Sequence, residues 1–290
     1  MKFETFITQV QGDLQERLKN QDVLLKEVEK NNNQRKTGLL ISDKESNISP
    51  IFYLEEFYED YQNGEDIKSI VTTLVTNYEE QKHLDIAKME LLKDYQQARK
   101  HLLVKLVNKE LNKELLKSMP YFEYLDLVLI FSVIVQAERG KTGTVLVSNS
   151  QLEEWQIDKE TLREDALTCA RERMPLEFLG MSEVLFQMCG VREETEEEVM
   201  YVLSNTSRSY GAAVILYPEC LKMVAEHLND DYYLLPSSIH EVIIVPKEKA
   251  VAEEELSNMV KEVNATQLDP EDILSDHAYF YSRSLQALQM

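Results

Sequence analysis

The chain has 290 residues, with 52 acidic and 31 basic side chains and a formal net charge of −21. A surface with this charge repels phosphate backbones and anionic lipids, and Lys and Arg are interspersed with Glu. Binding to nucleic acid or to a membrane surface is therefore not expected. With 43% hydrophobic residues, 8 Gly and 7 Pro, the composition is that of an ordinary globular protein with a sizeable core.

The cysteines and the apolar segments are those of a protein in a reducing, aqueous compartment. Cys169, Cys189 and Cys220 are an odd number without paired spacing, which argues against a disulfide framework and a zinc knuckle. The N-terminal sequence lacks the apolar segment of a signal peptide. The longest apolar run, Leu125 to Val135, is about half of the roughly 20 residues that a membrane span needs. We expect a cytoplasmic protein without a metal or another cofactor.

The first third of the chain has mainly helical periodicity. Apolar residues between Phe3 and Val28 recur at three- and four-residue steps, which predicts one amphipathic helix that ends at the run Asn31 to Asn33. TGLLIS and SPIFYL are typical of two short strands around a polar turn. Residues 54–81 return to helical period, with further helix to about Arg99. We assign residues 1–99 to a helix-rich N-terminal region with a short β-hairpin.

From His101 the pattern becomes that of a sheet packed with helices. HLLVKLV alternates like a strand, and the run from Leu125 to Val135 is apolar on both faces, as in a covered central strand. TGTVLVSN is expected to pair with that run as a hairpin neighbour. Helices are predicted in KELNKELLKS, from Asp158 as N-cap to Arg173, and around Ser182 to Met188.

The last third has the clearest boundaries between elements. EVMYVLSN, GAAVILY, DYYLL and HEVIIV are typical of strands, and Pro218 opens a helix. A further helix, EEELSNMVKEV, is expected to turn inward its residues Leu256, Met259, Val260 and Val263. Residues 100–290 are therefore predicted to form an α+β domain in which helices pack on a mixed or antiparallel sheet.

The only His-Glu pair, His240 and Glu241 in LLPSSIHEVIIVP, resembles the start of the H-E-x-x-H helix of zinc proteases. The residue four after His240 is Ile244, however, and the segment is β-branched and closed by a proline, so we predict a strand. On a strand the two side chains point to opposite faces and cannot share a metal ion. A buried polar group there needs a partner, for which the nearest candidates are Ser237 and Ser238.

The residue types of nucleophilic catalysis occur in the same part of the chain. Two combinations would supply a nucleophile and a base: Cys220 with His240, or Ser237 or Ser238 with Asp276 and His277. Neither serine lies in a G-x-S-x-G turn, and Cys220 occupies the first turn of an apolar helix, where a packed thiol is expected. Residue types alone, without a known geometry, are weak evidence for catalysis. We therefore favour a structural role for the histidine.

Four other features each have a binding and a structural interpretation. Trp155, the only tryptophan, is either a stacking platform or a packing anchor. The aromatic cluster in IFYLEEFYEDY is either a partner groove or core between helices. Gly140-Lys141-Thr142 lacks the upstream glycine of a phosphate-binding loop and fits a hairpin turn. The acidic run at 192–198 fits a solvated loop. In each case the structural interpretation is favoured.

Five stretches carry a resemblance to a known family: LVNKELNKELLKSMPYFEYLDLVLIF, VSNSQLEEWQID, YVLSNTSRSYGAAVILYP, LLPSSIHEVIIVP and ATQLDPEDILSDHAYFY. They resemble a bacterial family that is frequent in anaerobic Gram-positive gut bacteria and is known only as a domain of unknown function. The resemblance spans nearly the whole chain. It implies a cytoplasmic bacterial protein and no reaction, because it brings no catalytic or binding motif.

The sequence favours a non-enzymatic binding or regulatory protein, since no complete catalytic or cofactor motif is present, and its acidic surface would steer a basic protein partner. The alternative, a hydrolase or other small-molecule enzyme, predicts that Ser237, His240 and Asp276 converge in one pocket. A DNA mimic would instead show a stripe of carboxylates at phosphate spacing. The candidate binding residues are Trp155, Ser237, Ser238, His240, Glu241, Asp276 and His277.

Overall fold

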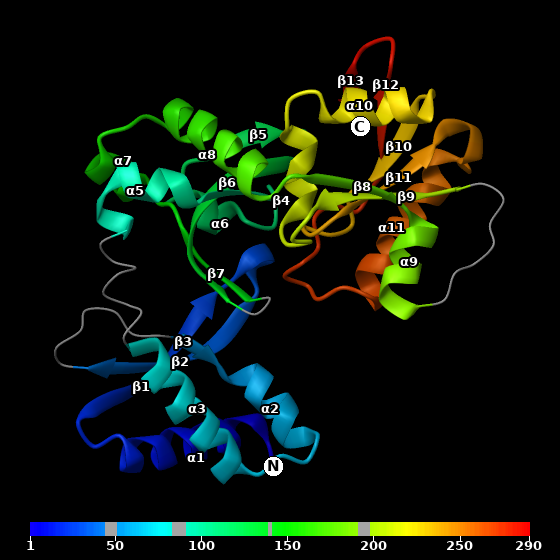
Figure 1. Ribbon diagram of the computed structural model, residues 1–290. Coiled ribbons are helices and arrows are strands. Elements are labelled where there is room, and N and C mark those ends of the chain that lie inside the picture. The colour runs from blue at the N-terminus through cyan, green and yellow to red at the C-terminus, as the bar shows by residue number, and fades with distance from the viewer. Residues whose placement is uncertain (44–50, 83–90, 139–140, 191–197) are drawn as a thin grey trace. The chain divides into compact units, whose positions relative to one another are not determined.

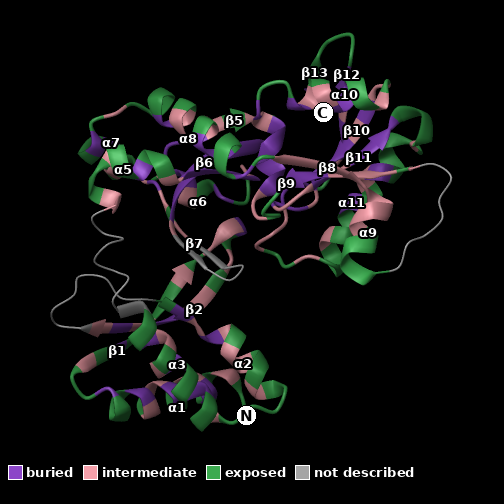
Figure 2. Cartoon of the chain, in the orientation of Figure 1, coloured by how far each residue is buried: buried purple, intermediate pink, exposed green. Residues whose placement is uncertain are grey.

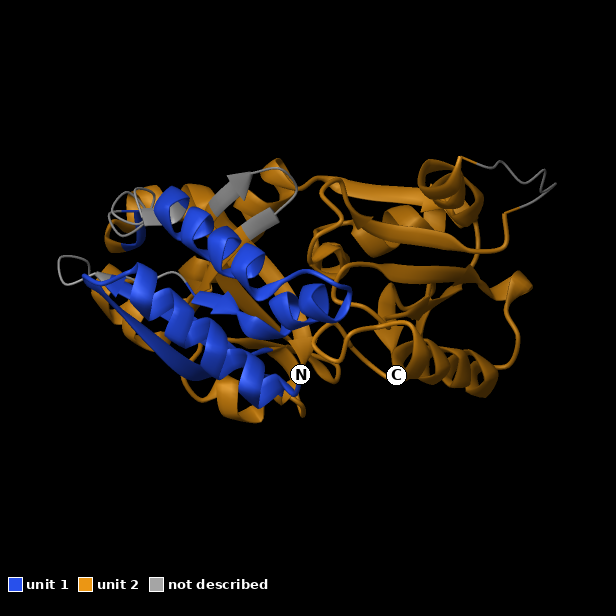
Figure 3. Ribbon diagram, turned by 90° about the horizontal axis from the view of Figure 1, so that it is seen from below, with its two compact units in different colours: residues 1–30, 34–92 blue, residues 31–33, 93–290 orange. Residues whose placement is uncertain are grey.

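A computed structural model of the chain describes residues 1–43, 51–82, 91–138, 141–190 and 198–290 (Figure 1). The chain divides into two compact units, residues 1–30 with 34–92 and residues 31–33 with 93–290 (Figure 3). Each unit has its own sheets and is described by itself. Among the described residues, no helix has both the length and the apolar character that crossing a membrane requires.

In its described residues, the first unit packs helices on a small antiparallel sheet of order β1-β2-β3. Its elements are α1 (Phe3–Arg17), β1 (Gln21–Glu29), β2 (Arg35–Asp43), β3 (Ile51–Tyr53), α2 (Leu54–Gln62) and α3 (Ile67–Lys82). Phe52 is buried in the core, and Phe57, Tyr58 and Tyr61 pack against it. The aromatic cluster is thus core between helices, the interpretation that the sequence favoured.

The N-terminal helix is shorter than predicted, because the chain leaves helical geometry at Leu18 and then forms β1. The Gln15 side chain accepts a bond from the Val23 amide at 3.1 Å and donates to the Gln21 carbonyl at 2.9 Å, which holds the turn between the two elements. β1 then pairs with β2 over its whole length. Local periodicity does not reveal a distant partner strand, so the apolar spacing in β1 imitated a helix.

The second unit contains two antiparallel sheets. The smaller has the order β4-β6-β5, with β7 also paired to β6. Every residue from Leu127 to Ile134 in β6 is buried, which confirms the predicted central strand. The elements are η1 (Asn31–Asn33), α5 (Tyr95–Ala98), η2 (Arg99–His101), β4 (Leu102–Asn108), α6 (Lys113–Leu116), β5 (Phe122–Tyr124), β6 (Leu127–Glu138), β7 (Lys141–Leu146), α7 (Asn149–Trp155) and α8 (Lys159–Arg173).

Two sequence features at this sheet have the expected form. Asp158 caps α8 by accepting the Thr161 amide. Positions 138 and 141 are opposite each other in the backbone register of β6 and β7, which supports a hairpin in place of a phosphate loop. Gly140 itself lies outside the described residues, as do most of the acidic run, residues 191–197, and part of the helix predicted to reach Arg99, residues 83–90.

The larger sheet has six strands in the order β13-β12-β10-β11-β9-β8. With the antiparallel pairing of all three sheets, it confirms the predicted α+β class. The elements of this part are β8 (Leu176–Gly180), α9 (Met181–Cys189), β9 (Tyr201–Asn205), η3 (Gly211–Leu216), α10 (Cys220–Leu228), β10 (Tyr232–Leu235), β11 (Val242–Pro246), η4 (Lys247–Lys249), α11 (Glu253–Thr266), β12 (Tyr279–Ser282) and β13 (Ala287–Gln289).

Helices cover both faces of the six-stranded sheet (Figure 1). On one face, Phe178 and Tyr201 pack against His227 of α10. On the opposite face, Val245 and its neighbours pack against Leu256 of α11. α9 lies on the α11 side, over the edge formed by β8 and β9 (Figure 1). Burial of this edge is incomplete.

Three local predictions for the last third are wrong. GAAVILY is not a strand but the 3-10 helix η3, because Tyr210 before it has a left-handed backbone that breaks a strand. β11 begins at Val242, so His240 and Glu241 precede the strand. Met259 and Val263 of α11 are exposed, since only one side of that helix meets the sheet. In addition, β8, β12 and β13 were not predicted from the sequence.

Candidate functional site

His240 is held by the loop between β9 and η3. The Asn205 side chain shapes this loop, accepting bonds from the amide and the hydroxyl of Ser207 at 3.1 and 2.8 Å and donating to the Ser209 carbonyl at 2.9 Å. A Cβ on Gly211 would lie 2.4 Å from the carbonyl oxygen of His240. The sequence therefore requires glycine at position 211, and the close approach fixes the loop against His240.

Both ring nitrogens of His240 face a partner. Nδ1 accepts the backbone amide of Tyr210 at 3.3 Å, and the Tyr210 ring stacks on the imidazole at 5.6 Å between centroids. Nε2 lies 3.4 Å from Oδ1 of Asp272. The bond with this carboxylate raises the pKa of His240, and burial of the ring opposes the rise. The arrangement holds the ring and leaves neither nitrogen directed at solvent.

Lys105 of β4 extends this contact chain into the smaller sheet of the same unit. Its side chain is buried, with Nζ 3.8 Å from the centre of the Tyr210 ring and 2.9 Å from the hydroxyl of Thr144. A cation above an aromatic face is attracted by the ring quadrupole. The contacts therefore connect Lys105, Tyr210, His240 and Asp272 in one chain of side chains.

The serine-rich turn before His240 serves the backbone more than the imidazole. Ser238 is buried, and its hydroxyl accepts the amide of His240 at 3.0 Å. Burial raises the pKa of Glu241, and the charge of His240 and a bond from Ser238 each lower it in part. The turn thus supplies the expected partner to Glu241, whereas the His240 ring is satisfied by Tyr210 and Asp272, which lie far away in sequence.

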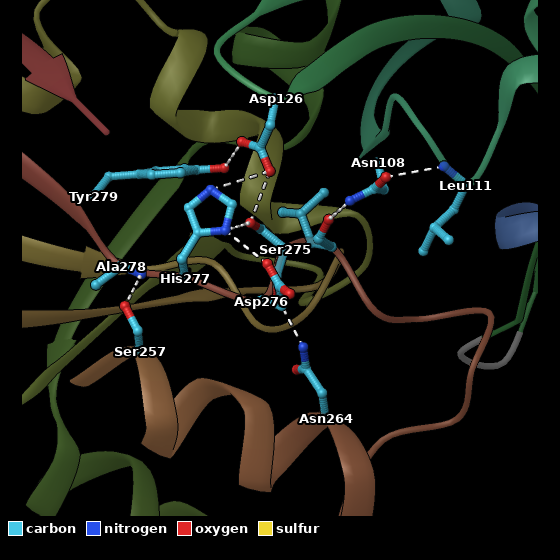
Figure 4. A network of polar contacts seen from close by, with 11 residues as sticks. Asn108, Leu111, Asp126, Ser257, Asn264, Ser275, Asp276, His277, Ala278 and Tyr279 are labelled. Atoms are coloured by element: carbon cyan, nitrogen blue, oxygen red, sulfur yellow. Dashed lines mark hydrogen bonds and ion pairs between the residues drawn. The ribbon is translucent and has the colours of Figure 1, made fainter. Parts of the chain in front are cut away.

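His277 belongs to a second cluster, around Asp126 (Figure 4). The Asp126 carboxylate accepts hydroxyl bonds from Tyr279 and, at 2.8 Å, from Ser275. His277 places Nε2 3.5 Å from Asp126 and Nδ1 2.7 Å from the exposed Asp276. Burial and the bond to Asp126 raise the pKa of Tyr279, so the phenol remains a hydrogen-bond donor.

The two histidines are placed by two chain segments that pair with each other, residues 236–241 and 272–279, which we call the paired segments. The amides of Ile239, Leu274 and Ser275 donate to the carbonyls of Asp272, Ser237 and Pro236 at 2.8 to 2.9 Å. The side chains of Asn32 and Asn108 donate to the carbonyls of Ile273 and Leu274 at 2.6 and 3.0 Å. The sequence did not point to Asp126, Asp272, Ser275 or Tyr279, because long-range contacts define them.

The candidate catalytic residues make separate contacts. His240 pairs with Asp272 and Asp276 pairs with His277, so Ser237, His240 and Asp276 do not form one constellation. In the described part of the chain, the hydrogen bonds of Ser237 are made by its backbone. Burial raises the pKa of Cys220 to about 12, which keeps this thiol protonated. The geometry favours packing roles for these residues.

Trp155 lies at the C-terminal end of α7, where it is buried and its ring is 5.3 Å from that of Tyr95. Tyr95 donates to Asp165 at 2.6 Å, and Arg99 bonds the same carboxylate at 2.9 Å. A cavity of about 790 Å³ adjoins these side chains. Because the indole is itself buried, it supports the wall of this cavity and offers little area for stacking.

β8 and α9 are less buried than most elements of a packed fold (Figure 2). α9 has the sequence MSEVLFQMC and contains no buried side chain, with Leu185 41%, Phe186 36% and Met188 72% exposed. Every residue of β8 is only half-buried. We define the β8–α9 surface as Leu179, Val184, Leu185, Phe186, Met188 and Val202.

Carboxylates adjoin the β8–α9 surface. Glu177 of β8 pairs with Arg208 at 3.1 Å. Glu198 bonds the amide and the hydroxyl of Ser182, in the first turn of α9, at 2.7 and 2.6 Å. Glu183 belongs to the same turn. The apolar surface is thus bordered by more negative than positive charge. The whole chain likewise has an excess of negative charge.

No group in the described part of the chain brings together three His, Cys, Asp or Glu side chains that could hold a metal ion. The fold and its sites define a two-unit α+β protein with a polar network between paired segments and an incompletely covered apolar edge. By sequence, residues 3–283 match the model of a family of unknown function, DUF5688, and the chain belongs to that family. No curated protein and no solved structure matches the chain.

Proposed function

We propose that this chain is a binding protein, and that its β8–α9 surface takes an apolar segment of another protein that carries lysine or arginine. The exposure of α9 carries the proposal. This helix has Val, Leu, Phe and Met side chains but no buried residue, so it buries little apolar surface within its own fold. Contiguous exposed apolar side chains of this kind are typical of interaction sites.

Charge favours one class of occupant for this surface. Glu177, Glu183 and Glu198 adjoin it, and the whole chain has a formal charge of −21, so a basic segment is attracted. A second copy of the chain would bring the same negative charge to the interface. Burial of Leu185 and Met188 would supply about 1.5 to 3 kcal/mol per side chain. Apolar contact and charge together favour a basic partner over self-association.

The alternative, a hydrolase with a site near Ser237, His240 and Asp276, gains no support from the geometry. Its three residues make separate contacts with other parts of the fold. A binding role does not require those residues to converge, and it accounts for the exposed apolar side chains of α9.

Binding of synthetic peptides tests the proposal. The probe is a fluorescent peptide of alternating valine and lysine, with matched peptides in which glutamate replaces lysine or serine replaces valine. We expect the valine-lysine peptide alone to bind, and Leu185→Ser with Met188→Ser to weaken it at least tenfold, since about 1.4 kcal/mol corresponds to a factor of ten. Leu285→Ser with Met290→Ser removes side chains of similar exposure, 60% and 67%, and should bind like wild type.

Three results would overturn the proposal. Equal binding by the double variant at α9 would place the peptide elsewhere. Equal binding of the serine-lysine peptide would mean attraction by charge alone. Self-association that the α9 variant abolishes, measured by sedimentation, would assign the surface to a second copy.

A further inference from the structure

The β8 strand is an outer strand of the six-stranded sheet, and in the described part of the chain one side of its backbone pairs with no other strand. β8 pairs with β9 in antiparallel register, from Leu176 opposite Asn205 to Gly180 opposite Tyr201. Within the described residues the sheet order ends at β8. An edge of this kind presents amide and carbonyl groups to any strand that approaches.

The hydrogen bonds that flank β8 show which of its residues face outward. The Met181 amide donates to the Met200 carbonyl at 2.9 Å, and the Pro175 carbonyl accepts the Thr206 amide at 3.0 Å. The N–H and C=O groups of one residue in an antiparallel strand point to the same side, and successive residues alternate. Positions 177 and 179 therefore also face β9, whereas the backbone groups of Leu176, Phe178 and Gly180 point away from it.

In its own sequence and register, β8 lacks the usual protections of an edge strand. Natural edges are blunted by lysine, by proline within the strand, by a bulge or by extreme shortness. LEFLG contains neither lysine nor proline, it pairs with β9 without a register shift, and its one charged residue, Glu177, forms an ion pair with Arg208. Leu176, Phe178 and Leu179 make the strand apolar, which is the composition that favours pairing with another chain.

From these observations we infer that the partner adds to the sheet as an extended strand beside β8. The inference rests on the proposed function, for which it supplies the mode of binding. Strand addition gives affinity through main-chain bonds and specificity through alternate side chains. The partner's side chains on the α9 side of the sheet would contact the apolar residues of that helix, and its alternate, basic side chains would lie on the opposite face, where Glu198 approaches Gly180.

A proline substitution separates main-chain pairing from side-chain contact. Leu176→Pro removes an amide that points away from β9, so the β8–β9 ladder keeps its bonds. Leu176→Ala is the matched control, because it also loses the leucine side chain but retains the amide. We expect the alanine variant to bind the valine-lysine peptide within about threefold of wild type, and the proline variant to bind at least tenfold more weakly than the alanine variant.

Amide hydrogen exchange provides a second test in the wild-type protein, where folding of a variant is not in question. Binding should slow exchange of the outward amide of Phe178. Unchanged exchange there, or equal binding by the proline and alanine variants, contradicts strand addition. If the Leu185→Ser, Met188→Ser protein still loses the peptide in that case, the binding surface stands and only the mode of binding is wrong. If that variant also binds normally, both proposals fall.

Discussion

The paired segments and the β8–α9 surface differ in how fully the fold satisfies their side chains, by hydrogen bonds in the first and by burial in the second. In the paired segments, Asp126 and His240 have partners in the fold, and the buried Ser238 and Ser275 form hydrogen bonds. At the β8–α9 surface, a helix of Leu, Phe and Met has no buried side chain. The first region contains the residues that resemble catalytic motifs, and the second contains none.

This contrast shows that residue type is a poor guide to function when the contacts are unknown. A histidine beside an aspartate stabilises a fold as readily as it transfers a proton, and its partners decide between the two roles. An apolar helix is expected in a core, so exposure of its side chains is the more informative observation. Four predictions test the contrast, in order of decreasing effect.

Gly211→Ala should be the most destabilising change, because the new Cβ would meet Ser204 Oγ at 2.0 Å and the His240 carbonyl oxygen at 2.4 Å. Overpacking against backbone costs about 3 kcal/mol. Gly12→Ala is the matched control, since nothing lies within 4 Å of its Cβ and it lies within α1, where alanine gains about 0.5 to 1 kcal/mol. Urea unfolding measures both. A Gly211→Ala protein as stable as wild type would mean that the loop is not fixed against His240.

Asp126→Asn should cost about 1 to 3 kcal/mol of unfolding free energy, because the Tyr279 and Ser275 hydroxyls lose a charged acceptor. Asp276→Asn changes the other carboxylate that contacts His277, but Asp276 is 66% exposed, so we expect a change within about 0.5 kcal/mol. Chemical denaturation of the two variants under identical conditions makes the comparison. Equal effects would argue against a structural role for the Asp126 cluster.

Asp272→Asn should make stability less dependent on pH. The folded pKa of His240 is raised by Asp272, so its contribution is fully present below about pH 6.5 and is lost as the pH rises through the raised folded value. The stability of the wild type, measured by its denaturation midpoint, should therefore exceed that of the variant most near pH 5.5 and least near pH 8.5. His240→Phe, without a titrating ring, should abolish the trend. A difference that grows with pH has the wrong sign for this account.

Leu185→Ser with Met188→Ser should change the unfolding free energy least, by about 0.5 kcal/mol or less, because neither side chain is buried in the fold. Leu256→Ser, in the buried face of α11, supplies the contrast and should cost about 2 kcal/mol or more. Thermal unfolding of the wild type and of these two variant proteins is sufficient. A large loss of stability at α9 would mean that this helix is part of a core.

Sequence periodicity predicted the elements whose signals are local. The run from Leu127 to Ile134, the Asp158 cap of α8 and the helix around Ser182 to Met188 are all present. β1 was mistaken for helix because its identity depends on β2, and η3 was mistaken for a strand because Tyr210 adopts a left-handed backbone. Local sequence reveals neither the partner of a strand nor a left-handed backbone conformation at a tyrosine.

The candidate residues were predicted less completely. His240 and His277 do lie in polar clusters, but Asp126 is about 150 positions from His277, and no spacing rule connects them. The sequence placed a short helix at Ser182 to Met188 without indicating its exposure, since an apolar helix is expected to be buried. Exposure depends on what the rest of the chain covers, which only the fold provides.

Hydrogen exchange with and without the valine-lysine peptide tests the central claim most directly. The account predicts that added protection is confined to residues 176–189 and 201–205, and that the paired segments, 236–241 and 272–279, exchange as before. Protection centred on the paired segments, with β8 and α9 unchanged, would contradict the account and move the binding site to the histidine clusters.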